Sequence, residues 1–384
     1  MKTLVTILIG ATLITLALFG YAKYVPHPPT SPSPKKQAST QKITNTPEAP
    51  VVSTIATGLH VPWALAFLPD GDLLVTERGG TVRIIRKDTG LDPNILYTIN
   101  DAKEIGEGGL LGIALHPDYP KKPYIYFYYT YSGNIVTVKN RLVRFTFKNE
   151  RFSDPSVLID SIPAGSNHDG GRIKFGPDGY LYITTGDSGD PSLAQNKMSL
   201  AGKILRVTDE GEPVSENPFA LGNENPLIYS YGHRNPQGLA WDSNGALWET
   251  EHGRSSPTGY DEVNLITPGK NYGWPTIQGN ETKTGMETPI INSGPTTTWA
   301  PSGAVFADNS LFFAGLRGQT LYEAVIKDSK VTEFQEHFKG EFGRLRDVIL
   351  GPDGYLYVTT SNRDGRGVPN SEDDRIIRMN PSKM

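Results

Sequence analysis

A histidine and an aspartate lie nineteen residues apart, at the two ends of a predicted β-hairpin. The run Asn167-His-Asp-Gly-Gly-Arg172 precedes one strand-like stretch, and Gly186-Asp-Ser-Gly189 follows the next. Because a hairpin brings such ends together, the Asp187 carboxylate can hold one ring N–H of His168 and leave the other ring nitrogen as a general base. A histidine that only stabilises a Gly-rich turn would have the same spacing, so the pair alone is not diagnostic.

Several arginines occur in Gly-containing segments that are far apart in the chain. Arg234 belongs to the run Tyr231-Gly-His-Arg-Asn-Pro-Gln-Gly238, and Arg317 immediately precedes a glycine. Arg344 and Arg346 alternate, as they would on one face of a strand. Each of them, taken singly, could be a solvated surface residue. If they converge on one loop cluster, their mutual repulsion calls for an anion among them, so the pattern indicates a poly-anionic ligand.

An acidic loop follows in the same half of the chain. It runs from Thr250 to Glu262 and is followed by a strand-like stretch and by Asn271-Tyr-Gly-Trp-Pro275. Carboxylates and turn carbonyls in a chain without Cys suit an oxygen-preferring cation such as Ca²⁺ better than zinc. Most Asp-Glu pairs are simply solvated, so the signal is weak by itself.

The composition indicates a folded, globular protein. The 384 residues include 37 Lys and Arg against 41 Asp and Glu, a net charge of −4, which argues against a nucleic-acid partner. A hydrophobic fraction of 37%, with 10% aromatics, suffices for a core and excludes wholesale disorder. The chain has no Cys, which excludes disulfides, thiolate metal sites and a Cys nucleophile. Its 41 Gly and 30 Pro, with many Tyr and Phe, favour an all-β chain.

One turn-and-strand template recurs along the chain. Clear copies begin at Leu68-Pro-Asp-Gly71, Gly176-Pro-Asp-Gly179 and Gly351-Pro-Asp-Gly354, and weaker copies have their turns near residues 117, 243 and 302, so that the copies are about 48 to 66 residues apart. Asp-Gly and Asn-Gly suit tight hairpins because both residues tolerate positive φ. Six copies predict a six-bladed β-propeller with four antiparallel strands per blade. A pair of β-sandwiches would not need the turn at these intervals.

The first fifty residues differ from this body. Residues 1–23 contain twenty consecutive uncharged residues after Lys2, which predicts either a cleaved signal peptide or a membrane anchor. Residues 24–50 contain seven Pro and no periodic pattern, which predicts an extended linker. We therefore expect residues 51–384 to form the propeller and the chain to be exported. An uncleaved segment would leave it at the outer face of the cytoplasmic membrane, and cleavage would release it to the periplasm or the medium.

In these residues the chain resembles the soluble PQQ-dependent aldose sugar dehydrogenases of the glucose/sorbosone dehydrogenase family. The resemblance covers nearly all of residues 51–384, in order. It is carried by Gly109–Gly112 with His116-Pro117, Asn167–Gly171, Gly186-Asp187, Leu200–Arg206, Tyr231–Gln237, Glu251–Gly253, Asp261–Asn264, Asn271–Pro275, Arg344–Val348 and Ser361–Arg366.

The resemblance implies a propeller that binds pyrroloquinoline quinone (PQQ) at one end of its channel. His168 matches the family's catalytic base and Asp187 its partner. The positions that match or are expected to be cofactor-binding are Arg234, Asn235, Gln237, Arg317, Arg344, Arg346 and Glu107. Glu107 is a departure, because some members have Gln there and a carboxylate would face an anionic cofactor.

Calcium is also implied by the resemblance. The main-chain carbonyls of Gly253 and Arg254 match those that hold the cofactor's Ca²⁺, and a backbone ligand survives the replacement of the Pro that some members have at the second position. Glu262 and the main chain of Tyr272 match a second, structural Ca²⁺ site.

The implied activity is oxidation of the anomeric carbon of an aldose to the lactone, with His168 as base, hydride transfer to PQQ and an external electron acceptor. Two other classes remain open from the sequence. One is a Ca²⁺-dependent propeller hydrolase such as a lactonase, which would not need four arginines at the channel. The other is a tethered, non-catalytic propeller, which has no use for a His–Asp pair facing them.

Overall fold

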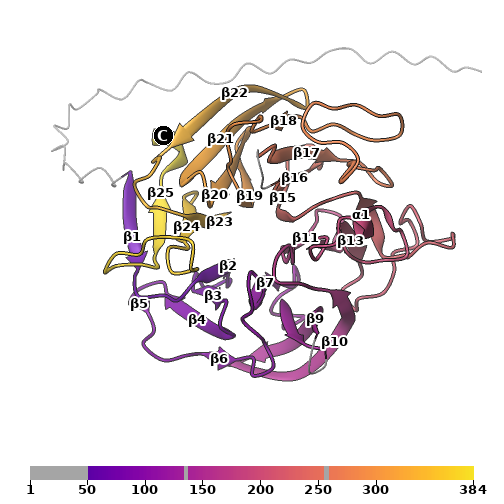
Figure 1. Cartoon of the computed structure of the whole chain (residues 1–384). Helices are drawn as coiled ribbons and strands as arrows, with labels where there is room; N and C mark the ends of the chain where they lie inside the picture. The colour runs from indigo at the N-terminus through magenta and orange to yellow at the C-terminus, as the bar shows by residue number, and fades with distance from the viewer. Residues whose placement is uncertain (1–50, 134–136, 255–258) are drawn as a thin grey trace, which may run out of the picture. The chain divides into compact units, whose positions relative to one another are not determined.

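The computed structural model describes residues 51–133, 137–254 and 259–384 of the chain. These residues form six antiparallel sheets arranged in a ring, which confirms the predicted six-bladed β-propeller (Figure 1). The helical elements among them are a single turn, α1 (Ser192–Gln195), and a short 3₁₀ helix (Pro381–Lys383). None of the helices in these ranges is long and apolar enough to cross a bilayer. Residues 1–50, for which the sequence predicts a signal or anchor and a linker, lie outside the described residues.

Each blade is built from consecutive strands, with the exception of blade 6. Blade 1 contains β2 (Pro62–Phe67), β3 (Leu73–Glu77), β4 (Thr81–Arg86), β5 (Gly90–Leu91) and β6 (Tyr97–Thr98). Blade 2 contains β7 (Leu110–Leu115), β8 (Tyr124–Ser132), β9 (Val138–Lys148) and β10 (Arg151–Pro163). Blade 3 contains β11 (Ile173–Phe175), β12 (Leu181–Thr185), β13 (Lys203–Val207) and β14 (Ile228–Tyr231).

The second half of the ring follows the same order. Blade 4 contains β15 (Pro236–Trp241), β16 (Leu247–Glu251), β17 (Glu262–Ile266) and β18 (Ile291–Asn292). Blade 5 contains β19 (Pro301–Ala307), β20 (Ser310–Gly315), β21 (Thr320–Lys327) and β22 (Lys330–His337). Blade 6 contains β23 (Leu345–Leu350), β24 (Leu356–Thr360), β25 (Ile376–Met379) and β1 (Val52–Ala56).

The ring is closed by strands from the two ends of the described chain. Strand β1 pairs with β25, Val52 opposite Met379 and Thr54 opposite Ile377, so the indigo and yellow ends lie side by side in Figure 1. This pairing removes the open edge that blade 6 would otherwise present.

The predicted turns join the first and second strands in five of the six blades, as at Leu68–Asp72 between β2 and β3. The prediction for blade 5 is wrong, because Pro301–Ala304 lies inside strand β19 and the turn is made by Asp308-Asn309. Asp308 takes a positive φ of 52° there, a conformation that Asp tolerates, so no Gly is needed. Blade 1 also differs from the four-strand pattern, since β5 and β6 both pair with β4.

Buried charges join the innermost strands around the centre of the ring. The Arg172 guanidinium from blade 3 lies 3.0 Å from the Asp347 carboxylate of blade 6. The Lys174 amine donates to the carbonyls of Leu239 and Ala304, in blades 4 and 5. These contacts tie four blades together around the channel and give the loops at its end a rigid base.

Candidate active site

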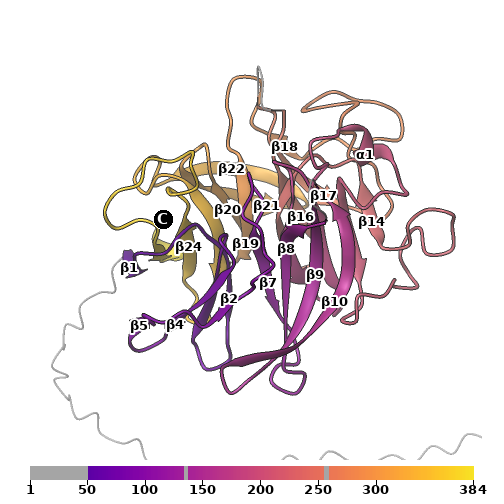
Figure 2. The same cartoon turned by 60° about the horizontal axis from the view of Figure 1, so that its bottom comes forward.

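The residues selected from the sequence lie on connections that share one end of the blades. One kind of connection leads from a blade to the innermost strand of the next, and the other joins the second and third strands of a blade. Because neighbouring strands are antiparallel, both kinds end at the same face of the ring. Figure 2 shows α1 and the long loops beside it projecting from one end of the strands. The first kind carries Glu107, His168, Arg234 and Arg344, and the second carries Asp187, Gly253, Arg254 and Arg317.

His168 and Asp187 are in direct contact. Nδ1 of His168 lies 2.6 Å from Oδ1 of Asp187, whose side chain is fully buried. The indole N–H of Trp274 donates to Oδ2 of Asp187 at 2.8 Å, and the Gly189 N–H donates to Oδ1 at 2.8 Å. Burial by itself raises the pKa of the Asp187 carboxyl, but the hydrogen bond and charge of His168, with these two N–H donors, hold it below its ordinary value. Asp187 is therefore ionised and fixed in orientation.

The backbone at His168 is shaped by contacts from two other connections and from strand β12. His168 has a positive φ of 62°, and its N–H donates to Oε2 of Glu107 at 3.0 Å. The N–H of Gly170 donates to Oδ1 of Asn235 at 3.0 Å. A Cβ on Gly170 would lie 2.6 Å from the carbonyl oxygen of Thr184, so only glycine fits this approach. Asn235 thus directs its carbonyl oxygen at the turn that follows His168.

Two cavities meet at His168. The first, of about 300 Å³, is lined among others by His168, Glu107, His252, Gly253, Asp261, Arg234, Arg254, Arg317, Arg344 and Arg366. The second, of about 510 Å³, is lined by His168, Asp187, Gly189, Pro191, Arg234, Arg254, Trp274, Pro275, Thr276, Gln278 and Glu281. His168, Arg234 and Arg254 belong to both, so the imidazole lies between an arginine-rich cavity and a more open one with an indole and two carboxylates.

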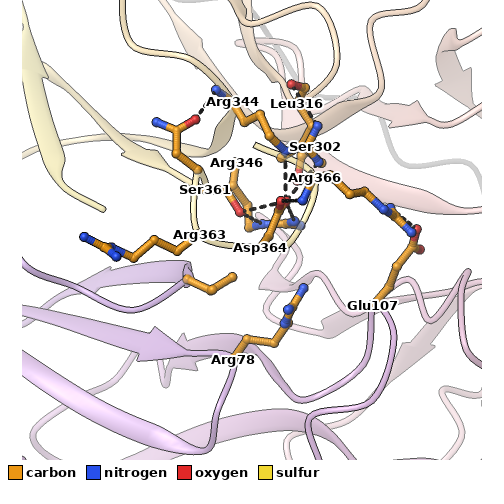
Figure 3. A network of polar contacts seen from close by, with 12 residues as sticks. Arg78, Glu107, Ser302, Leu316, Arg344, Arg346, Ser361, Arg363, Asp364 and Arg366 are labelled. Atoms are coloured by element: carbon orange, nitrogen blue, oxygen red, sulfur yellow. Dashed lines mark hydrogen bonds and ion pairs between the residues drawn. The ribbon is translucent and has the colours of Figure 1, made fainter. Parts of the chain in front are cut away.

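Arg344 and Arg346 share one carboxylate, Asp364 (Figure 3). The Arg344 side chain approaches it at 2.9 Å and also donates to the Leu316 carbonyl at 3.3 Å. Arg346 is 3.4 Å from the same carboxylate oxygen and donates to Oγ of Ser361 at 3.0 Å. Burial lowers the pKa of Arg346 to about 10, and Asp364 opposes this effect. Only Arg344 of the two lines the larger arginine-rich cavity, because Arg346 lies beside a separate space of about 20 Å³.

The unexpected carboxylate, Glu107, is neutralised by an arginine from the far end of the chain. Arg366 lies 2.5 Å from Oε1 of Glu107, a contact between residues 259 positions apart (Figure 3). Burial alone would raise the pKa of Glu107, whereas the His168 N–H and the Arg366 guanidinium both lower it. His252, which lines the same cavity, is neutral because burial lowers its pKa to about 3. The ion pair thus removes the charge conflict that the sequence suggested at Glu107.

The remaining predicted cofactor residues are divided between the cavities. The Arg234 side chain lines both large cavities, and its Nη1 donates to the His252 carbonyl at 3.3 Å. Arg317 lines the arginine-rich cavity. Gln237 accepts from Oγ of Ser302 at 3.1 Å and lies with Arg346 at the small space behind it.

The residues expected at calcium sites lie in two places. Gly253 and Arg254 line the arginine-rich cavity, and Oδ1 of Asp261 accepts from the Gly253 N–H at 2.8 Å, which fixes the backbone at Gly253. Glu262 is buried, accepts from the Gly279 N–H at 3.1 Å, and shares a space of about 10 Å³ with Tyr272. This donor set of carboxylate and carbonyl oxygens suits Ca²⁺.

Three residues of the site were not singled out from the sequence. Trp274 orients Asp187, Asp364 holds the two arginines, and Arg366 pairs with Glu107. All three lie within motifs that carried the resemblance, Asn271–Pro275 and Ser361–Arg366. The sequence therefore marked these segments as part of the site, but it did not indicate what each of the three side chains does.

Comparisons with known proteins agree with this arrangement. A family model described as glucose/sorbosone dehydrogenase matches residues 59–376. The aldose sugar dehydrogenase YliI of Escherichia coli K12 is 35% identical over 340 residues, covering 82% of this chain and 91% of that protein.

Two solved structures are similar over most of the chain. One is a putative oxidoreductase (glucose dehydrogenase) from Thermus thermophilus, with 46% identity, a TM-score of 0.80, and coverage of 85% of this chain and 98% of that one. The other is the PQQ-bound aldose sugar dehydrogenase of Streptomyces coelicolor, with 43% identity, a TM-score of 0.78, and coverage of 85% and 97%. With the family model spanning most of the propeller and the His–Asp pair beside an arginine-rich cavity, this chain belongs to the glucose/sorbosone dehydrogenase family.

Proposed function

We propose that this protein is a PQQ-dependent aldose sugar dehydrogenase that oxidises the anomeric carbon of an aldose to the lactone. The observation that carries the proposal is the position of His168. Its imidazole is held by a buried, ionised Asp187 and borders both the arginine-rich cavity and the open cavity beside it. Such a pair can take a proton from a substrate in one cavity while an electron acceptor occupies the other.

The arginine-rich cavity fits PQQ by charge. Five arginines line it against two carboxylates, Glu107 and Asp261; one of the five is already paired with Glu107, and Arg344 is paired with Asp364. The excess positive charge complements the three carboxylates of PQQ through charge-assisted hydrogen bonds. We assign Arg234, Arg317 and Arg344 to direct contact and Arg346 to support. When bound, the quinone supplies the hydride acceptor, a chemistry that no side chain provides.

His168 is assigned the proton transfer. With Nδ1–H donated to Asp187, Nε2 carries the lone pair, and the side-chain amide of Asn167 donates toward it at 3.2 Å. Nε2 would remove the proton of the anomeric hydroxyl as the C–H hydrogen leaves with its electron pair, so that the carbonyl of the lactone forms. The ionised Asp187 stabilises the imidazolium that results, and Trp274 keeps the carboxylate in place.

The open cavity is assigned to the sugar. Its lining combines the Trp274 ring system with Gln278 and Glu281. An aromatic face and a few hydrogen-bonding groups suit a sugar ring, and the larger volume suits several aldoses.

Calcium belongs to the proposal as well. The carbonyls of Gly253 and Arg254 would hold a Ca²⁺ at the edge of the arginine-rich cavity, where it would orient the cofactor and polarise a quinone oxygen. Glu262 and the main chain of Tyr272 would hold a structural Ca²⁺ at the small space that they share.

The cellular setting is also proposed. Residues 1–23 would direct export, residues 24–50 would tether or precede the propeller, and an external acceptor outside the cytoplasm would reoxidise the cofactor. The support for this is the uncharged apolar run after Lys2 and the Pro-rich segment that follows it.

The decisive assay adds PQQ and Ca²⁺ to the purified apoprotein with an aldose and an artificial electron acceptor. Dye reduction that requires PQQ is the expected result. Hydrolysis of a lactone without PQQ would instead identify a hydrolase, and the absence of both reactions together with no PQQ binding would identify a non-catalytic propeller.

A further inference from the structure

We propose that Arg172 and Lys174 bind a small monovalent anion such as chloride in the central channel, outside the proposed catalytic site. Both residues belong to the innermost part of blade 3, since Lys174 lies within β11 and Arg172 directly precedes that strand. Because the two residues alternate along extended backbone, their side chains lie on one face, with Cβ atoms roughly 7 Å apart. One small ion can therefore contact both cationic groups.

The charges of these residues are not balanced by their neighbours. The Arg172 guanidinium lies 3.0 Å from Oδ1 of Asp347, and both side chains are buried. Within residues 51–133, 137–254 and 259–384, Asp347 is the only carboxylate that raises the pKa of Arg172 or of Lys174. Burial lowers the pKa of Lys174 to about 8, so its amine is still mostly protonated at neutral pH. Two cations thus face one carboxylate, and a monovalent anion would restore neutrality.

The Arg172 guanidinium has a hydrogen-bond donor that is not used. Its Nε donates to the Gln237 carbonyl at 2.9 Å, and its Nη1 faces Asp347. The remaining nitrogen, Nη2, is buried and has no hydrogen-bond partner among the described residues. Buried polar atoms are normally satisfied, so this nitrogen calls for an acceptor. A water molecule would accept the hydrogen bond, but only an anion would also balance the charge.

Lys174 differs from Lys203, a lysine that is buried elsewhere in the same blade. The Lys203 amine donates to three carbonyls, those of Leu193, Ala194 and Ala201, so all three of its N–H groups are used. The Lys174 amine donates to two carbonyls of the described residues, and Lys174 is only half-buried. Its third N–H is therefore available to a ligand, and its partial exposure gives a small ion access to the amine.

The anion would stabilise the ring where four blades meet. Arg172 and Lys174 belong to blade 3 and Asp347 to blade 6, and the Lys174 amine reaches carbonyls of blades 4 and 5. Without a counterion the two cations repel each other at this junction. Anion binding should therefore raise the stability of the folded chain. The measurements that follow are the position of the ion and the melting temperature, and neither depends on the proposed enzymatic activity.

The first test locates the ion. Crystals of the wild-type chain are grown without halide and soaked in low-millimolar NaBr, and anomalous diffraction is recorded at the bromine absorption edge. We expect a bromide peak within hydrogen-bond distance of both Nη2 of Arg172 and Nζ of Lys174. Bromide found only elsewhere, for example in the arginine-rich cavity, would overturn the proposal. This experiment needs no variant, so it decides the proposal even where a substitution prevents folding.

The second test measures affinity through the melting temperature, while NaCl replaces sodium methanesulfonate, a salt with a bulkier anion, at constant ionic strength. The melting temperature of wild type should rise with chloride, because a ligand that binds only the folded state stabilises it. In Lys174→Met the remaining Arg172–Asp347 pair is neutral, so chloride affinity should fall roughly tenfold or more.

Lys203→Met is the matched control, because it also removes a buried amine but should keep the chloride-dependent rise. Chloride bound in the arginine-rich cavity would contribute equally to wild type and to both variants. The proposal is overturned if the melting temperature of wild type does not respond to chloride. It is equally overturned if Lys174→Met responds as wild type does.

Discussion

Arg344→Ala should weaken PQQ binding far more than Arg346→Ala, although the two arginines are alternate residues of one motif. Arg344 lines the arginine-rich cavity, whereas Arg346 lies beside the small space behind it. Nε and Nη2 of Arg344 both lie 2.9 Å from Oδ2 of Asp364, so removing this side chain would delete the proposed cofactor contact and also leave the Asp364 charge less compensated.

The expected size follows from these contacts. A lost charge-assisted hydrogen bond costs about 2 kcal/mol where it is partly desolvated, which corresponds to a Kd roughly 30-fold weaker. Arg346→Ala leaves the Arg344–Asp364 pair intact, and we expect a change below about fivefold, or about 1 kcal/mol.

The assay is a calorimetric titration of each apoprotein with PQQ at one fixed salt concentration. Arg378→Ala serves as the matched control, because Arg378 is a surface arginine that pairs with Asp353 far along blade 6 and should leave the Kd unchanged. Unchanged affinity in Arg344→Ala, or an equal loss in Arg344→Ala and Arg346→Ala, would refute the assignment of the two guanidinium groups.

Three further outcomes are expected. His168→Gln should retain PQQ binding but lower kcat by roughly 10²–10⁴-fold because the base is lost, and Asp187→Asn should likewise bind PQQ and turn over slowly. An unchanged kcat of His168→Gln in steady-state dye reduction would refute the assignment of His168 as the base. Burial raises the pKa of Asp169 to about 7, so the folded state holds a proton that the unfolded state loses near pH 4, and the stability of the protein should fall as pH rises from about 4 to 7. The melting temperature of Asp169→Asn should lack this fall between pH 4 and 7, and the same pH dependence in the variant and the wild type would contradict the prediction. The truncated chain 51–384 should be soluble and active, whereas 57–384, which lacks β1, should melt at a lower temperature because blade 6 is left open. An inactive 51–384 beside an active longer form would show that the domain boundary at residue 51 is wrong.

Much of the fold could be read from local sequence patterns. Asp-Gly turns followed by aromatic and β-branched residues specify hairpins through contacts between near neighbours, and their recurrence predicted the six blades. The contact of His168 with Asp187 belongs to the same class, because one hairpin spans the nineteen residues between them. Blade 5 shows the limit of such reasoning, since Asp308 supplies the turn with a positive φ that no glycine signals.

The parts that only the tertiary structure decided depend on which blades become neighbours. Glu107 and Arg366 are 259 residues apart, and their ion pair exists because closure of the ring brings blades 6 and 2 to the same channel mouth. Which arginine of the Arg344–Arg346 pair faces the large cavity is decided by the placement of Asp364 on another loop, and sequence alternation cannot reveal it. A chain pattern determines each strand and turn, whereas the charge balance of a site is determined by residues that only the packed ring brings together.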